Sequence, residues 1–427
     1  MQPKTITSLL VGMMILVPAG LGVATTTTTA TRELSPAALP SVELKPLLFS
    51  PKTMLVNLWE RYKETYVGPD GRTSDPDRNG ATTSEAQSYT MLRAVWMDDQ
   101  ETFDRAWAWT REHLDRPGDG LHAWFYGKRS GGGEGILTEE NGMRAASDAD
   151  QDIALALLFA HARWQEASYR QDALAILNSI WEHEVIVING TPYLAAHDLD
   201  HEALPPAITL NPSYFAPYAY RIFAEADPAH PWEELIDSSY AVLAAAPEVV
   251  APEDTAGLPP NWIAVDRQSG RLLPIGGAAN HFGFDALRIP WRIGLDARWN
   301  ADPRAEAVLE SMEFIPEQWV QYQWLAAEYT PRGTPAVAYA APAMRAMALP
   351  VFFETQNNET AQDFYKEQVF PFYNADVNAW REPLSYYDDN WTWFSMALYH
   401  DLLPNLAEPP DARLIPTSAS LPDPFIP

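Results

Sequence analysis

Three aspartates at alternate positions begin the most informative stretch of this sequence. Residues 144–165 read RAASDADQDIALALLFAHARWQ, so Asp148, Asp150 and Asp152 stand directly before an apolar run with helical spacing. An EF-hand calcium loop that began at Asp148 would need Gly at its sixth position and Glu at its twelfth, and this chain has Ile and Phe there. The spacing therefore excludes an EF-hand.

A helix start accounts for the same acids in a different way. The exposed N–H groups and the dipole of a first helical turn favour negative charge. At such a start Asp148 and Asp152 lie on one face, where a carboxylate can also hold a sugar hydroxyl or a water molecule. The two interpretations are compatible, because the acids can begin a helix while Asp148 also serves a site.

Glu85 has a comparable setting in the segment ATTSEAQSYTMLRAVW. It stands before a helical apolar face made by Tyr89, Leu92, Val95 and Trp96. A helix N-terminus initiated at Ser84 explains the acid without any chemistry. As a general acid, Glu85 would need a raised pKa, which the helix dipole opposes, so apolar packing or a neighbouring carboxylate would have to raise it.

The third candidate acid is Asp285, in HFGFDALRIPWRIGLD. It stands among apolar residues and close to two arginines, Arg288 and Arg292. It is either an arginine-paired acid at a helix start or one member of a reacting pair. Two acids in a cleft rich in Trp and Tyr make up the general plan of a glycosidase.

Other classes of protein lose support from composition and missing motifs. The chain has no HExxH, GxSxG or GxxxxGK[ST] motif, which disfavours a metalloprotease, an α/β-hydrolase and a nucleotide enzyme. It has no cysteine, so neither a disulfide nor a Cys-ligated metal can form. Its 29 basic and 57 acidic residues give a net charge of −28, which disfavours nucleic acid and anionic membranes and favours a neutral or cationic substrate.

Apolar residues with helical spacing recur along most of the chain and predict about a dozen helices. These lie near residues 55–62, 89–96, 103–107, 153–160, 174–181, 213–225, 232–243, 285–299, 303–312, 316–327, 340–354, 360–369 and 391–402. Strand patterns are local, in VIVINGTPYLA with its Asn189-Gly190 turn and in WIAVDRQSGRLLPI. We therefore expect an all-α fold of helical hairpins around a centre, with short β-hairpins in loops and a cleft at one end.

The two ends differ from this pattern. Residues 1–24 place Lys4 before an apolar stretch and end in small residues, as in an export signal or, if uncleaved, an N-terminal membrane anchor. Residues 25–47 form a Thr- and Pro-rich spacer, residues 48–405 the catalytic domain, and residues 406–427 a Pro-rich tail. We expect a secreted or periplasmic protein that is monomeric.

The segments around the three acids resemble glycoside hydrolase family 8, the inverting endoglucanases and their relatives. The run from Ala146 to Trp164 is similar to the family signature, and SEAQSYTM from Ser84 looks like its S-E-G-Q-G-Y-G-M segment. The segments NPSYF from Asn211 and DALRIPW from Asp285 are similar to two further family segments in the same chain order. The resemblance implies an (α/α)6 barrel.

The resemblance also implies roles for single residues. Glu85 would be the general acid, Asp285 the general base that activates water, and Asp148 a carboxylate that holds the sugar. Tyr214 would place the water, and Trp124 and Arg288 would contact substrate. No metal or organic cofactor is required. We also expect other aromatic residues to line the cleft: Tyr89, Tyr126, Trp291 and Trp391.

Two departures from the family pattern bear on substrate preference. Ala86, Ser88 and Thr90 replace glycines, which we expect to narrow the space beside Glu85, and Phe284 stands where many relatives have Tyr. The leading hypothesis is an exported endo-β-1,4-glucanase that cleaves cellulose or a related β-glucan. Chitosanase ranks second because the negative chain would attract a polycation, followed by mixed-linkage glucanase and oligoxylanase. A glycan-binding or accessory protein of polysaccharide secretion with little turnover is the alternative of another class.

Overall fold

The structure, a computed structural model, describes residues 50–200, 203–356 and 358–409. The expected signal or anchor 1–24, the spacer 25–47 and most of the tail 406–427 lie outside the described residues. Helix dominates the described part, and its β-structure consists of short strands in two- and three-stranded antiparallel sheets. No helix among these residues is both long and apolar enough to cross a membrane.

The described residues contain thirteen α-helices, which agrees with the dozen predicted. They are α1 (Pro51–Tyr66), α2 (Ser84–Met97), α3 (Gln100–His113), α4 (Ser147–Trp164), α5 (Ala167–His183), α6 (Pro217–Ala226), α7 (Trp232–Val250), α8 (Ile289–Asn300), α9 (Pro303–Ser311), α10 (Phe314–Tyr322), α11 (Pro342–Thr355), α12 (Asn358–Phe364) and α13 (Tyr386–Tyr399).

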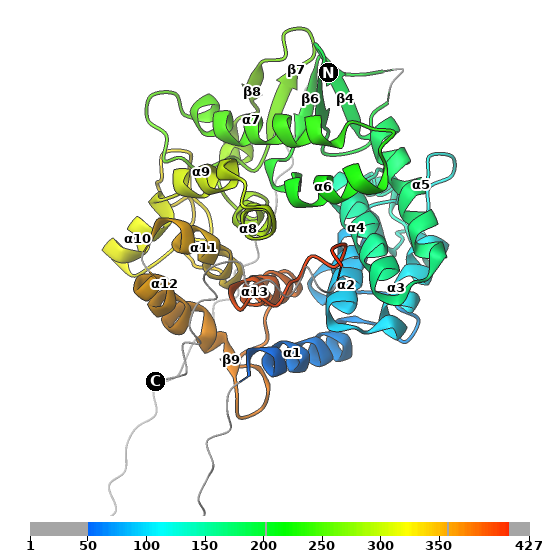
Figure 1. The fold of residues 1–427 in the computed structure, drawn as a ribbon, viewed down its shortest axis with the longest axis horizontal. Helices are drawn as coiled ribbons and strands as arrows, with labels where there is room; N and C mark the ends of the chain where they lie inside the picture. Colours follow the sequence, from blue (N-terminus) through cyan, green and yellow to red (C-terminus); the bar gives the residue numbers. More distant parts are fainter. Residues whose placement is uncertain (1–49, 201–202, 357, 410–427) are drawn as a thin grey trace, which may run out of the picture. The chain divides into compact units, whose positions relative to one another are not determined.

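These helices pack as hairpins around a centre (Figure 1). Consecutive helices pair as α2 with α3, α4 with α5, α6 with α7, α8 with α9 and α11 with α12, and α1 pairs with α13. The first helices of these consecutive pairs also pack on one another in chain order: α2 on α4, α4 on α6, α6 on α8 and α8 on α11. α11 then packs on α13. Six inner and six outer helices in this alternation form an (α/α)6 barrel, as the resemblance implied, and α10 is an additional helix.

Burial distinguishes the inner helices from the outer ones. Nearly every side chain of α2, α4 and α13 is buried, whereas α3 and α5 expose polar faces. Side chains join α13 back to α2: Arg93 donates to Asp389 Oδ1 at 3.0 Å and to Asn390 Oδ1 at 3.2 Å, and its guanidinium lies 3.9 Å from the Tyr62 ring centroid. A buried cation with such partners pins two inner helices together.

The strands form hairpins in the loops, as expected. They are β1 (Thr82–Thr83), β2 (Phe125–Lys128), β3 (Glu134–Ile136), β4 (Val185–Ile188), β5 (Thr191–Leu194), β6 (Ala207–Leu210), β7 (Ile263–Asp266), β8 (Leu272–Pro274), β9 (Tyr373–Asn374) and β10 (Ala379–Trp380). β4 and β5 pair around Asn189 and Gly190, which have φ of 52° and 86°, so the predicted Asn-Gly turn is confirmed. β7 and β8 form the second predicted hairpin.

Several helix boundaries differ from the sequence pattern, and two of them have a clear local cause. The predicted helix 316–327 ends at Tyr322, because Gln323 adopts a left-handed conformation with φ of 53° and its N–H caps Trp319 O. The predicted helix 391–402 begins earlier, since the Ser385 side chain accepts from Asp388 N and starts α13 at Tyr386. Capping side chains and backbone, rather than apolar spacing, decide these ends.

Two ion pairs connect α4 to the segment around the start of α8. Arg292 donates to both carboxylate oxygens of Asp152, at 2.9 and 2.8 Å, and Arg288 donates to Asp148 Oδ2 at 3.1 Å. The acids are four residues apart on α4, and the arginines are four residues apart as well. The Asp152–Arg292 pair, with side chains 3% and 0% exposed, is therefore a buried ion pair one helical turn along from the pair that contains Asp148.

We predict that Asp152→Asn destabilises the fold by about 3–5 kcal/mol, because it leaves the buried Arg292 without its charged partner. Urea denaturation measures the change. Asp237→Asn is the matched control, since the Asp237 side chain that pairs with Arg304 is 75% exposed, and its loss should cost about 1 kcal/mol or less. Equal losses of stability in the two variants would contradict a structural role for the buried Asp152–Arg292 ion pair.

Candidate active site

A single guanidinium brings the three predicted acids together. Arg288 Nη1 donates to Glu85 Oε2 at 3.0 Å and to Asp148 Oδ2 at 3.1 Å, and Arg288 Nη2 donates to Asp285 Oδ1 at 2.9 Å. Nη2 also donates to Ser213 Oγ at 2.8 Å. Arg288 is only 2% exposed, so these bonds form inside the protein, where they are poorly screened.

The ends of the inner helices place these groups. Glu85 lies in the first turn of α2 and Asp148 in the first turn of α4. Asp285 directly precedes the short 3₁₀ turn Ala286–Arg288 that leads into α8, and Arg288 is the last residue of that turn. The Thr83 side chain, not that of Ser84, caps α2 by accepting from Ala86 N at 3.0 Å. The site thus lies where several inner helices begin.

A cavity of about 500 Å³ opens onto two of the acids. The Glu85 and Asp285 side chains are 26% and 32% exposed, whereas that of Asp148 is 2% exposed. The cavity is lined by Asp75, Asp77, Arg78, Thr83, Glu85, Phe284, Asp285, Arg288, Ser385, Tyr386 and Tyr387. Glu85 and Asp285 can therefore reach a bound molecule directly.

Asp285 is held by three side-chain donors. Besides Arg288, Asn211 Nδ2 donates to its Oδ1 at 3.0 Å and Trp262 Nε1 donates to its Oδ2 at 3.0 Å. Asn211 is itself fixed, because its Oδ1 accepts from the backbone N and the Oγ of Ser213. The carboxylate consequently has one orientation.

Burial raises the pKa of Glu85, and the Arg288 charge opposes the rise. Burial likewise raises the pKa of Asp148, to about 7, with Arg288 again opposing and Glu85 adding to the rise. Three carboxylates share one cation here, so protonating one of them relieves repulsion. The low-polarity packing required for a general acid at position 85 is thus present.

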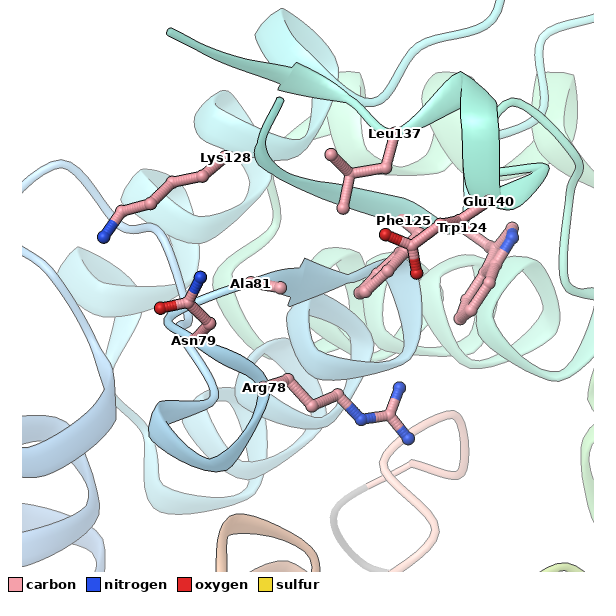
Figure 2. Close-up of a pocket in the computed structure, with 8 residues that line it drawn as sticks. All are labelled: Arg78, Asn79, Ala81, Trp124, Phe125, Lys128, Leu137 and Glu140. Atoms are coloured by element: carbon pink, nitrogen blue, oxygen red, sulfur yellow. The ribbon is translucent and has the colours of Figure 1, made fainter. Parts of the chain in front are cut away.

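Two other predicted contacts also lie at the site. The Arg288 guanidinium lies 5.1 Å from the centroid of the Tyr214 ring, and Tyr214 meets Trp262 edge to face. Trp124 lines an adjoining cavity of about 410 Å³, and its Nε1 donates to Asn141 O at 3.0 Å (Figure 2). Arg78 lines both cavities, so the two adjoin at this residue.

Three of the four further aromatic residues that we expected in the cleft lie in the barrel core. Tyr89, Trp291 and Trp391 are each at most 1% exposed and pack together there. For these three the expectation was wrong, because an apolar core of this size uses many aromatic side chains. Tyr126 is half-buried, packs edge to face on Trp109 and lines neither of the two cavities, and its contact with substrate stays a prediction.

The prediction that the residues in place of the family's glycines narrow the space beside Glu85 is also wrong. Ala86, Ser88 and Thr90 are buried and do not line the cavity. Ser88 Oγ donates to Glu85 O at 2.8 Å, and Thr90 Oγ1 lies 2.9 Å from the Tyr62 hydroxyl in the helix packing. By contrast, Phe284 does line the cavity, and its ring meets that of Tyr387 at 5.8 Å.

Sequence reasoning missed Trp262, Tyr387 and Arg78. Trp262 lies directly before β7 and reaches Asp285 across 23 positions of sequence. The Tyr387 hydroxyl donates to Phe284 O from the first turn of α13. Their proximity to the acids follows from how the loops fold, and no periodicity or short motif in the sequence predicts it.

Comparison with known proteins identifies the family. The profile described as "Glycosyl hydrolases family 8" matches residues 43–371. The chain belongs to glycosyl hydrolase family 8. Among the described residues of this family 8 protein, no group of three or more His, Cys, Asp or Glu side chains is arranged to hold a metal ion.

Similar proteins carry endoglucanase names. Endoglucanase A of Acetivibrio thermocellus is 30% identical over 263 residues, which are 60% of this chain and 51% of that protein. The Endoglucanase of Cellulomonas uda is 31% identical over 249 residues, 57% of this chain and 64% of that protein. The family 8 chain thus spans between one half and two thirds of these relatives.

A solved structure shows the same fold. The endo-1,4-D-glucanase from Vibrio fischeri ES114 superposes with a TM-score of 0.69 at 24% identity, covering 81% of this chain and 94% of that one. The likeness confirms the (α/α)6 architecture of the family 8 chain.

We predict that Asp148→Asn flattens the pH dependence of stability. The pKa of Asp148 is raised in the folded state, so its contribution is fully present below its unfolded pKa of about 4 and is lost as the pH rises towards 7. Urea denaturation of both proteins at several pH values between 4 and 8 tests this. Parallel stability curves for the two proteins would contradict it.

Proposed function

We propose that this protein is an inverting glycoside hydrolase that cleaves internal β-1,4-glucan bonds. The observation that carries the proposal is the bridge formed by Arg288, which gathers Glu85, Asp148 and Asp285 beside one cavity. Binding alone needs aromatic residues and hydrogen bonds but no such set of acids. The endoglucanase names of its relatives support the same assignment.

The reaction needs one proton donor and one proton acceptor. The protonated Glu85 carboxyl gives its proton to the glycosidic oxygen as the bond to the anomeric carbon breaks. A water molecule forms the new bond to that carbon from the opposite face, and Asp285 takes the proton that this water releases. Exchange with solvent then restores Glu85 and Asp285, both of which reach the cavity.

The proposal includes inversion, the outcome that the family 8 resemblance implies. Glu85 and Asp285 contact different terminal nitrogens of one guanidinium. Inverting enzymes keep roughly 6.5–9.5 Å between these groups so that a water can enter. We further propose that Asp148 holds the reacting sugar; its side chain is 2% exposed and pairs with Arg288, which lines the cavity.

The apolar stretch before residue 25 supports export to the periplasm or the exterior, where polymeric glucans are met. Chitosanase, mixed-linkage glucanase and oligoxylanase share the same chemistry and differ in the substrate that the cleft accepts. An accessory protein of polysaccharide secretion with little turnover would keep the binding surfaces and lack measurable hydrolysis.

We predict that Glu85→Gln lowers hydrolysis by at least about 100-fold, because an amide cannot protonate the leaving oxygen. Reducing-sugar release from carboxymethylcellulose, barley β-glucan, xylan and chitosan measures activity, and NMR of the first product gives its anomeric configuration. Glu112→Gln, an exposed acid on α3, is the control. If the wild-type protein released reducing sugar from chitosan or xylan alone, that polymer would replace β-glucan as the proposed substrate. No release from any of the four polymers would contradict the proposed enzymatic function.

We predict that Trp262→Phe lowers kcat roughly tenfold with little change in KM, because Asp285 loses a donor that orients it. Steady-state kinetics on a soluble glucan separate the two constants. Trp299→Phe is a matched control: its Nε1 donates to Leu403 O at 2.9 Å, outside the site. Equal kinetic losses in both variants would show that Trp262 acts only through folding.

A further inference from the structure

The cavity beside the catalytic acids differs from them in charge. The described residues that line it are Arg78, Asn79, Ala81, Trp124, Phe125, Lys128, Leu137 and Glu140. They carry two cations and one acid, whereas the cavity at the acids contains Asp75, Asp77, Glu85 and Asp285 against Arg78 and Arg288. Acids therefore outnumber cations in the cavity at the acids, and cations outnumber acids in the adjoining cavity.

The two cations keep much of their charge available to a ligand. Arg78 is 55% exposed at its side chain and meets a carboxylate only at 3.6 Å, from Asp75 Oδ2. Lys128 is exposed, and within the described part of the chain no carboxylate lies within ion-pair distance of it. The acid opposite Lys128 in the β2–β3 ladder, Glu134, is instead engaged by Arg72 at 2.6 Å.

The placement of these side chains fits a bound sugar chain. Figure 2 shows Lys128 and Asn79 at one end of the cavity and Trp124 with Glu140 at the other, with Arg78 below them. Trp124, half-buried and stacked on Phe125 at 4.6 Å, offers the flat apolar surface on which a pyranose ring packs. A sugar chain that stacks on Trp124 and follows the cavity would bring its substituents near Arg78 and Lys128.

We propose that Arg78 and Lys128 select the charge of the glycan: they favour a β-glucan that carries anionic substituents and disfavour the polycation chitosan. This inference rests on the proposed function and deepens it. It runs against the whole-chain charge of −28, which taken alone favours chitosan. Contacts at a subsite act within a few ångströms, whereas solvent and salt screen the net charge beyond about 8–10 Å.

The test separates binding from turnover by using Glu85→Gln protein, in which hydrolysis is blocked. Calorimetry measures Kd for cellohexaose, carboxymethylated cello-oligosaccharides and the glucosamine hexamer at pH 5.5, where the last is cationic. Adding Lys128→Glu should weaken the binding of the carboxymethylated ligand relative to that of cellohexaose roughly 2- to 5-fold. It should strengthen the binding of the glucosamine hexamer relative to that of cellohexaose by a similar factor. Arg78→Glu should act in the same direction.

Lys52→Glu is the matched control, because Lys52 is exposed on α1 and the substitution changes the net charge equally. Unchanged ratios in Lys128→Glu, or equal shifts in Lys52→Glu, would overturn the inference. A wild-type protein that hydrolyses none of the polymers would overturn the proposed function instead, and the Kd ratios would still decide whether this cavity selects charge.

Discussion

The shared guanidinium of Arg288 is the constraint on which the site depends. A buried arginine is tolerable only if acids surround it, and the acids tolerate their own proximity only because the arginine lies between them. Arg292 and Asp152 repeat the arrangement one turn along and hold α4 to α8. The positions of Glu85 and Asp285 therefore follow from the packing of the inner helices.

This arrangement also divides the roles of the acids. Glu85 and Asp148 have pKa values raised by burial, and either would be favoured as the protonated member of the cluster. Only Glu85 of these two lines the cavity, which is the placement that the proposed proton donor needs, whereas Asp148 is 2% exposed. Asp285 is the acid with donors from three different elements, a setting suited to holding one orientation towards water.

Sequence patterns predicted the inner helices and the three acids because both are local. The apolar spacing around Leu92 or Ile153 reflects one helix face, and Glu85 and Asp148 stand in the first turns that those faces define, while Asp285 directly precedes the turn into α8. The aromatic residues were less predictable, since Trp291 in the core and Trp124 in the cleft belong to the same residue type. Trp262 was unpredictable for another reason: its partner is supplied by a separate loop.

Charge illustrates the same difference between composition and placement. The sequence gives this chain a large acidic excess, and composition alone would pair it with a cationic polymer. In the fold many acids are engaged: Arg288 contacts three, and Asp302 contacts both Arg221 and Arg304. Lys128 and Arg78, by contrast, stand in the cleft with weak or no ionic partners among the described residues. What a ligand meets is the charge at its own contact surface, and in the cavity beside Trp124 the cations outnumber the acids.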